Sequence, residues 1–397
     1  MINKSEGSVE RLIFNCIIGA YFFLSLFKVF TLLDPVNTNF LQISNSTFYI
    51  LKIILVVLLF IRVALNIQNV DRKKIIVFFT MWTALAILQL FIGRYIDFSL
   101  ILLIAFAINI DSKSIYKAIL LGLLVGVCLE IFLVFNGTIL NSLGGVRLND
   151  VGRFNFGFYG LMIFGRVVRV IAMCHVMITK SPKLLHMGFI LMLSYFCYYE
   201  TKTRSEFLFV IFIYVMSFLV RRFDIKKFKN YLFMLGSVTL WLLPVISSIF
   251  GKYYNEIPML QSLNQFTTGR LQYSSWLWDI LSPKLFGNRW FQFSNGLQPG
   301  DIGYFYNFVD NGWDHLILIQ GLISTLIVLV SLQLILYLLT KNSEMIELIL
   351  MIFIIILFTF SQSVMFDIIM NPLLIKLGLY FKNGRSKNFE KHTLRIG

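Results

Sequence analysis

Apolar runs about as long as a lipid bilayer is thick recur along this chain from one end to the other. The hydrocarbon core of a bilayer measures about 30 Å, so a helix needs about 20 apolar residues to cross it. Apolar residues make up 58% of the chain, and 41 of them are Phe, which is more apolar surface than a soluble fold can cover. We therefore predict an all-α, polytopic integral membrane protein.

The runs predict about twelve transmembrane helices. Their expected spans are 12–33, 47–67, 75–93, 95–110, 115–135, 154–178, 184–199, 205–220, 231–250, 314–339, 345–360 and 364–381. The first nine helices occupy residues 1–250 with short loops, and the last three occupy 314–381. A large polar loop at 251–313 separates the two groups, and a basic tail follows at 382–397. The first run is too long for a cleavable signal peptide, so we expect it to stay as the first helix.

The net charge of +15 is distributed as a topology signal rather than as a nucleic-acid-binding surface. With the N-terminus in the cytoplasm, 20 of the 35 Lys and Arg residues lie in inside loops and nine in outside loops. We therefore expect a membrane protein surrounded by lipids, with both termini in the cytoplasm and residues 251–313 outside. No nucleic-acid partner is expected.

The four cysteines lie within proposed helices and lack the spacing of disulfides or metal ligands, so we expect them to be apolar packing residues. The expected outer loops also lack an Asp-x-Asp pair of the kind that holds divalent metals. We predict neither a metal nor a cofactor.

Several charged residues fall within proposed helices, where each costs about 2.5 to 3.5 kcal/mol unless it meets a partner or a polar cavity. Arg166 and Arg169 are three residues apart and share a helix face, whereas His175 points away from Arg166. One interpretation of Glu130 and Arg166 is a buried interhelical ion pair. Arg169 and Lys376 could instead extend to the cytoplasmic surface.

A second charged group forms a short turn between two proposed helices, at residues 200–206. It contains the acids Glu200 and Glu206 and the bases Lys202 and Arg204. A guanidinium held on so short a turn can form forked hydrogen bonds to phosphate oxygens. The alternative is that these charges anchor the turn at the membrane surface.

The loop at 251–313 is rich in aromatic and charged residues, and long structured loops are usually functional. Its aromatic rings could stack on sugars, or they could belong to the belt of Trp and Tyr found at membrane interfaces. Trp276 and Trp278, close to Arg270, are the best candidates for sugar contacts.

These segments resemble a family of membrane proteins. Thr201-Lys202-Thr203-Arg204-Ser205 is similar to the Ser/Thr-Arg-small motif that begins a helix in bacterial O-antigen, capsular and exopolysaccharide polymerases of the Wzy type, and in the related O-antigen ligases. Thr268-Gly269-Arg270, with Trp276 and Leu285-Phe286-Gly287 after it, resembles the start of their large outer loop. Asp310-Asn311, followed by Gly321, resembles its end. The resemblance covers roughly residues 150 to 330 and implies a GT-C-like membrane glycosyltransferase.

The chain departs from the family in two places. Many relatives have a Gly-Phe-x-His-Pro-Asn-like segment after the arginine of the preceding outer loop; here Arg153 is followed by 157–162, with Met162 at the place of the Asn. The ligases have His-Asn where this chain has Asp310-Asn311, and that His is regarded as their base. The resemblance therefore implies a polymerase more than a ligase, although His315 is close enough to substitute.

A polymerase of this kind transfers a growing glycan from undecaprenyl pyrophosphate to a sugar hydroxyl of the next lipid-linked oligosaccharide. The pyrophosphate must be neutralised and the hydroxyl must lose a proton. Candidate catalytic residues are Arg204 and Arg270 for the pyrophosphate, and Asp310 or His315 as base. Candidate substrate-binding residues are Arg153, Arg166, Arg289, Glu206, Trp276, Trp278 and Asn311. Glu206 is also a possible base. The implied partners include a chain-length regulator and a flippase.

Two other classes remain as alternatives. A ligase-like glycan transferase would use much of the same chemistry. A polytopic transporter or flippase would also have about twelve helices and buried charges, but it is expected to show internal repeats and short outer loops. We find no repeat, and residues 251–313 form a long loop.

Overall fold

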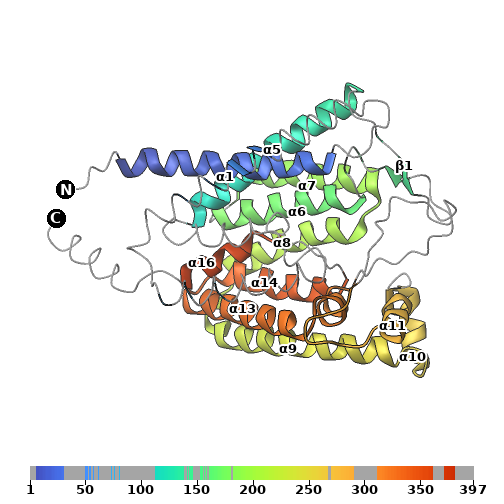
Figure 1. Ribbon diagram of the computed structural model, residues 1–397. Helices are drawn as coiled ribbons and strands as arrows, with labels where there is room; N and C mark the ends of the chain where they lie inside the picture. The colour runs from blue at the N-terminus through green and yellow to red at the C-terminus, as the bar shows by residue number, and fades with distance from the viewer. Residues whose placement is uncertain are drawn as a thin grey trace. The chain divides into compact units, whose positions relative to one another are not determined.

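The computed structural model describes residues 6–30, single positions between 50 and 80, 112–137, 141, 143–145, most of 153–179, 182–266, 270–289, 311–360 and 371–380 (Figure 1). This part of the chain is almost wholly helical, as predicted. Its two short strands, β1 (Leu143–Gly145) and β2 (Arg153–Phe154), pair antiparallel. The chain divides into two compact units, the first holding the described elements up to α8 and the second those from η3 onward.

The first unit is built around helix α6 (Leu161–Ile178). This helix packs against α5 (Ser112–Phe135), α7 (Leu184–Thr201) and α8 (Arg204–Arg222), and nearly all its side chains from Phe164 to Met177 are buried. Helix α1 (Glu6–Phe30) packs along α5, where Asn15 Nδ2 donates to Ser114 Oγ at 2.7 Å. Because its side chains are buried on almost every side, α6 forms the core of this unit.

The second unit is built around α9 (Lys229–Lys252), which η3 (Ile225–Phe228) precedes. Helices α13 (Leu322–Lys341) and α14 (Met345–Leu357) pack along α9. The remaining described elements are α10 (Pro258–Phe266), α11 (Arg270–Ile280), α12 (Gly312–Asp314), the π-helix η4 (His315–Gln320), η5 (Phe358–Phe360), η6 (Pro372–Lys376) and α16 (Leu377–Tyr380).

Within the described residues, three helices are long and apolar enough to cross a membrane: Ser112–Phe135, Ile225–Lys252 and Leu322–Lys341. Shorter apolar helices cover Asn15–Leu24 and Met345–Leu357. These helices support the membrane assignment made from composition. The helices predicted over 184–199, 205–220 and 231–250 match α7, α8 and α9 to within two residues at each end.

The helix predicted over 314–339 is a different structure. Residues 312–320 form the short α12 and η4, and the long helix begins only at Leu322, after Gly321 at φ +95°. The first amides of α13, at Leu322 and Ile323, donate to the carbonyls of Lys284 and Leu285 at 3.0 and 3.1 Å. Gly287 also packs directly on the backbone around Gly321. This tertiary contact satisfies the helix N-terminus and determines where the long helix starts.

Two other predicted boundaries also changed. The segment 251–313, expected to be loop, contains the helices α10 and α11. The helix expected over 154–178 begins at Leu161, because Arg153 and Phe154 are in β2 and Phe156 has a positive φ of 50°.

Candidate functional site

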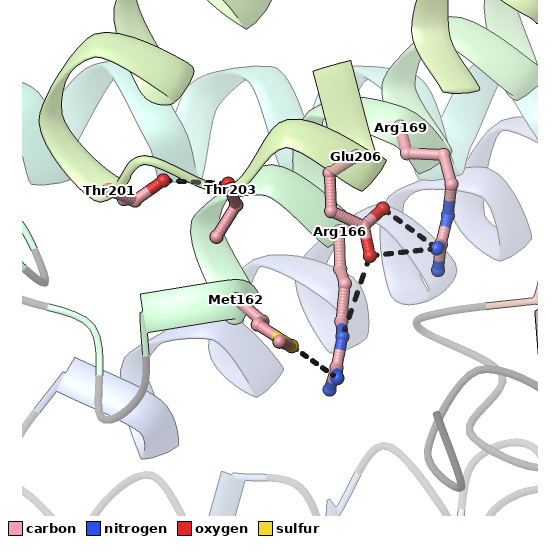
Figure 2. Close-up of polar contacts among 6 residues, drawn as sticks. All are labelled: Met162, Arg166, Arg169, Thr201, Thr203 and Glu206. Carbon is pink, nitrogen blue, oxygen red and sulfur yellow. Dashed lines mark hydrogen bonds and ion pairs between the residues drawn. The ribbon is translucent and has the colours of Figure 1, made fainter. Parts of the chain in front are cut away.

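Two buried charged residues of the first unit, Arg169 and Glu206, meet at the start of α8. Arg169 Nη1 donates to Glu206 Oε2 at 2.8 Å and to Oε1 at 3.2 Å (Figure 2). Arg169 is fully buried, and Glu206 is 7% exposed in the first turn of α8, where a helix N-terminus favours an acidic residue. One interpretation of the sequence was that Arg169 extends to the cytoplasmic surface, and the structure contradicts it. A buried guanidinium needs a carboxylate partner, which here is Glu206.

Arg166 lies one turn earlier on the same face of α6, as predicted. Its Nε is 3.8 Å from Glu206 Oε1, and its Nη2 contacts Met162 Sδ at 3.4 Å (Figure 2). Its side chain is 13% exposed, whereas that of Arg169 is 0% exposed. Glu206 is thus an acidic partner of Arg166, whereas neither carboxylate oxygen of Glu130 has a hydrogen-bond partner among the described residues. Arg166 lies at the open edge of the cluster.

The turn between α7 and α8 is held by its own side chains. Thr201 Oγ1 lies 2.7 Å from Thr203 Oγ1 and donates to the carbonyl of Cys197 at 2.8 Å. Lys202 between them has a positive φ of 54°, and its amide donates to the carbonyl of Tyr198 at 2.8 Å. Both threonine side chains are buried. The turn is therefore a fixed support for the residue that follows, Arg204.

Gly165 brings α6 against this turn. A Cβ added at Gly165 would lie 2.9 Å from Glu206 Cβ and 3.1 Å from Thr203 Oγ1. Any larger residue would separate the two helices that enclose the ion pair. Arg204 itself is exposed and makes no ion pair within the described part of the chain. Its guanidinium is thus accessible and is carried by a rigid turn.

Four polar side chains of the second unit converge on Asp314, which is fully buried. Ser247 Oγ donates to its Oδ1 at 2.9 Å and Trp278 Nε1 to the same oxygen at 3.1 Å. Asn311 Nδ2 donates to Oδ2 at 2.8 Å, and Ser274 Oγ is hydrogen-bonded to that oxygen as well. Four donors thus surround one carboxylate and join α9, α11 and α12.

Asp314 lies before the span of α13, and burial raises the pKa of its carboxyl to about 6. The hydrogen bonds from Ser274, Trp278 and Ser247 act in the opposite direction and limit the rise. The carboxyl is therefore mostly ionised at neutral pH, which suits the four donors that surround it. Asp314 has the surroundings of a structural centre and not those of an exposed base.

Arg270 begins α11 on the face that carries Ser274 and Trp278, because these residues follow at four-residue spacings. That face is held against Asp314, and Arg270 is half-buried one turn away from Ser274. Gly251 of α9 makes room for the contact, since a Cβ there would overlap the Trp278 indole. The orientation of Arg270 therefore depends on the Asp314 network.

The other predicted residues of the second unit have distinct surroundings. Trp278 and Asn311 are parts of the Asp314 network, and Asn311 Oδ1 also accepts from the Trp313 amide at 3.1 Å. Trp276 is 38% exposed, Arg289 is exposed and His315 is half-buried. Asp310 lies outside the described residues, as does the side chain of Arg153, whose backbone is in β2.

Lys376 also contradicts the interpretation that it extends to the cytoplasmic surface. It is 1% exposed, and its Nζ lies 2.9 Å from Glu344 Oε1 and 3.1 Å from Glu347 Oε1. These contacts join η6 to the turn between α13 and α14 and to α14 itself. Lys376 is thus a structural residue.

Within the described residues, no group of three or more His, Cys, Asp or Glu side chains could hold a metal ion. The sequence reasoning missed Asp314, Ser247 and Ser274 as members of a polar centre. The sequence does contain one indication of this centre. Ser274 and Trp278 are four residues apart and so share a face of α11.

Comparison with known proteins adds no relative. The chain matches no protein-family model, no curated protein and no solved structure.

Proposed function

We propose that the chain is a membrane glycosyltransferase that polymerises lipid-pyrophosphate-linked oligosaccharide repeat units into a surface polysaccharide. In this proposal it has about twelve transmembrane helices in a GT-C-like arrangement and acts at the outer face of a bacterial cytoplasmic membrane. Support comes from the apolar helices and the sequence motifs. The observation that carries most weight is the cluster of Arg166, Arg169 and Glu206 packed against the turn before Arg204.

This cluster suits recognition of pyrophosphate. During transfer, the bond between the sugar anomeric carbon and the pyrophosphate oxygen breaks, and negative charge develops on the leaving group. A fixed guanidinium can neutralise that charge with forked hydrogen bonds. Arg169 is enclosed with Glu206, so its role is to hold the cluster. We assign phosphate contacts to Arg166 and Arg204, whose guanidinium groups are less enclosed.

The acceptor hydroxyl forms the new bond to the anomeric carbon and loses its proton to a base. Asp310 and His315 are the candidates for this base, with His315 next to the buried Asp314. Glu206 is a poor candidate, because its carboxylate already accepts two hydrogen bonds from Arg169. Arg270 is proposed as a further phosphate-binding residue, since the Asp314 network holds the helix that carries it.

Deletion of the gene tests the proposal, with analysis of the surface polysaccharide. Loss of a polymerase should leave single repeat units attached at the surface and remove the long chains. Loss of a ligase should remove every attached unit, and loss of a flippase should leave repeat units on the inner leaflet. Either of the last two patterns would exclude a polymerase.

Topology gives an independent test of the same proposal. A reporter inserted within residues 295–300 should be extracytoplasmic, and one fused after Lys391 should be cytoplasmic. If either location is reversed, the lipid-linked substrate and the proposed site are on opposite sides of the membrane.

A further inference from the structure

One face of α9 is apolar and exposed along most of its length. Val238, Leu242, Val245 and Ile249 follow one another at intervals of three or four residues, and their side chains are between 44% and 53% exposed. Because α9 is long and apolar enough to cross a membrane, this stripe is where lipid chains would contact it. The exposed apolar surface continues after the helix ends, at Tyr253.

Helix α11 lies beside the last turns of α9 and not beyond them. Through Asp314, its Ser274 and Trp278 are joined to Ser247, which is five residues before the end of α9 at Lys252. Five helical residues correspond to about 7.5 Å along the axis. The body of α11 is therefore level with the end of the membrane-spanning segment.

The side of α11 that faces away from Asp314 is also apolar. Tyr273, Trp276 and Ile280 are 44%, 38% and 50% exposed, and their spacing of three and four residues places them on one stripe. We call these three residues the outer stripe. Gln272 and Asp279 are exposed as well, but they lie on a neighbouring strip of the same helix. An exposed apolar stripe of this kind indicates a surface that contacts lipid or another protein.

We propose that the outer stripe of α11 is immersed in the interfacial layer of the bilayer leaflet in which α9 ends, so that α11 lies in the membrane surface. The level of α11, beside the last turns of α9, supports contact with this layer, and Tyr and Trp are the side chains enriched at that depth. Leu285 and Phe286, 60% and 50% exposed, add apolar surface after α11.

The charged residues near α11 also suit contact with the membrane surface. Lys252, at the end of α9, and Lys284, shortly after α11, are both exposed. Their apolar stems can lie along the lipid surface while their ammonium groups reach the phosphates of the head groups. On this inference Trp276 contacts lipid and not a sugar ring, in contrast to the expectation from the sequence. The inference depends on α9 crossing the membrane and not on glycosyl transfer.

Spin labels on the full-length protein in liposomes test this placement. The exposed Cys16 and Cys128 would be changed to Ala, and the buried Cys174 and Cys197 kept. Single cysteines would then be introduced as Tyr273→Cys, Trp276→Cys and Ile280→Cys, with Gln272→Cys and Asp279→Cys as matched controls on the same helix. Collision with oxygen, which concentrates in lipid, is compared with collision with a water-soluble nickel chelate.

The labels on the outer stripe should have a ratio of oxygen to nickel collisions severalfold higher than the two control labels. Equal nickel access at all five positions would mean that the stripe faces water. Low access of both reagents at the stripe would mean that protein covers it, and a high oxygen ratio at all five positions would mean that α11 is fully immersed. Each of these three results overturns the proposal. All five positions are exposed, so labelling should preserve the fold, and gel filtration checks this.

Discussion

Arg169 and Glu206 form an enclosed ion pair that joins the middle of α6 to the first turn of α8, with Nη1 at 2.8 Å from Oε2. Moving both charges out of water is expensive, and a buried pair of this kind is weak evidence for net stability. Its effect is geometric. Because Glu206 is also 3.8 Å from Arg166 Nε, the pair determines where a second, partly exposed guanidinium lies.

Removing one partner of the pair should be strongly destabilising. Arg169→Met leaves the Glu206 carboxylate buried without its main partner, which should lower the free energy of unfolding by about 3 to 5 kcal/mol. Denaturant titration of the purified protein in micelles measures this. The double variant Arg169→Met/Glu206→Gln should lose less than the sum of the two single variants. Additive losses would show that the two side chains are not coupled.

The close contact of α6 with the turn before α8 gives a matched pair of glycine variants. Gly165→Ala places a methyl group 2.9 Å from Glu206 Cβ and should cost about 1 to 3 kcal/mol of stability. Gly188→Ala on α7 meets no atom within 4 Å and should be neutral or stabilising by about 0.5 to 1 kcal/mol. Thermal unfolding compares the two. Equal stability of both variants would contradict the packing of α6 on α8.

Much of the helical architecture could be predicted because bilayer thickness sets the length of an apolar run. Helices α7, α8 and α9 follow directly from their runs. The start of α13 could not be predicted, because it depends on Gly287 packing against Gly321, residues separated by a long segment. Local hydropathy contains no signal for such a contact.

The candidate site was predictable in its residue types and not in its pairings. Arg166 and Arg169 had to share a helix face, but the sequence does not say whether α6 brings them to Glu130 or to Glu206. Their partner depends on which helix packs there. In the same way, the sequence predicts Asp314 at the start of a membrane helix. Its donors Ser247 and Ser274 come from other helices, so no local pattern indicates the polar centre around it.

The proposed phosphate contact predicts that charge alone is insufficient at Arg204. Arg204→Lys keeps the charge but loses the forked geometry, so it should reduce polymer formation nearly as much as Arg204→Ala. A loss of about 10² to 10³ in rate is typical for one such group. Arg222→Lys, at the other end of α8, is the control. Normal polymer from Arg204→Lys, at normal protein level in purified membranes, would mean that Arg204 only anchors the turn at the membrane surface. Arg270→Lys should behave like Arg204→Lys.

Asp314 should make stability depend on pH. Folding raises the pKa of this carboxyl from 3.8 to about 6, so the folded state favours the protonated form. This contribution is fully present below pH 3.8 and is lost as the pH rises through about 6. The loss is on the order of 3 kcal/mol. The melting temperature should therefore fall more steeply across this window in the unaltered chain than in Asp314→Asn.

Asp314→Asn should also be less stable at every pH, because an amide nitrogen cannot accept from the surrounding donors. Each donor left without a partner costs about 1 to 3 kcal/mol. Asp224→Asn changes a carboxylate whose side chain is 62% exposed and serves as the control for the substitution itself. If Asp314→Asn keeps the pH dependence of the unaltered chain, Asp314 is not the group that titrates.

Asp310 and His315 can be separated by one pair of variants, measured as polymer length in purified membranes supplied with lipid-linked repeat units. If Asp310 takes the acceptor proton or positions the hydroxyl, Asp310→Asn should abolish polymer, while His315→Gln leaves a substantial fraction. If His315 is the base, the order reverses and activity should fall below about pH 6.5, where an imidazole becomes protonated. Normal polymer from both variants would remove both residues from the chemistry and leave the arginines as the whole of the proposed site.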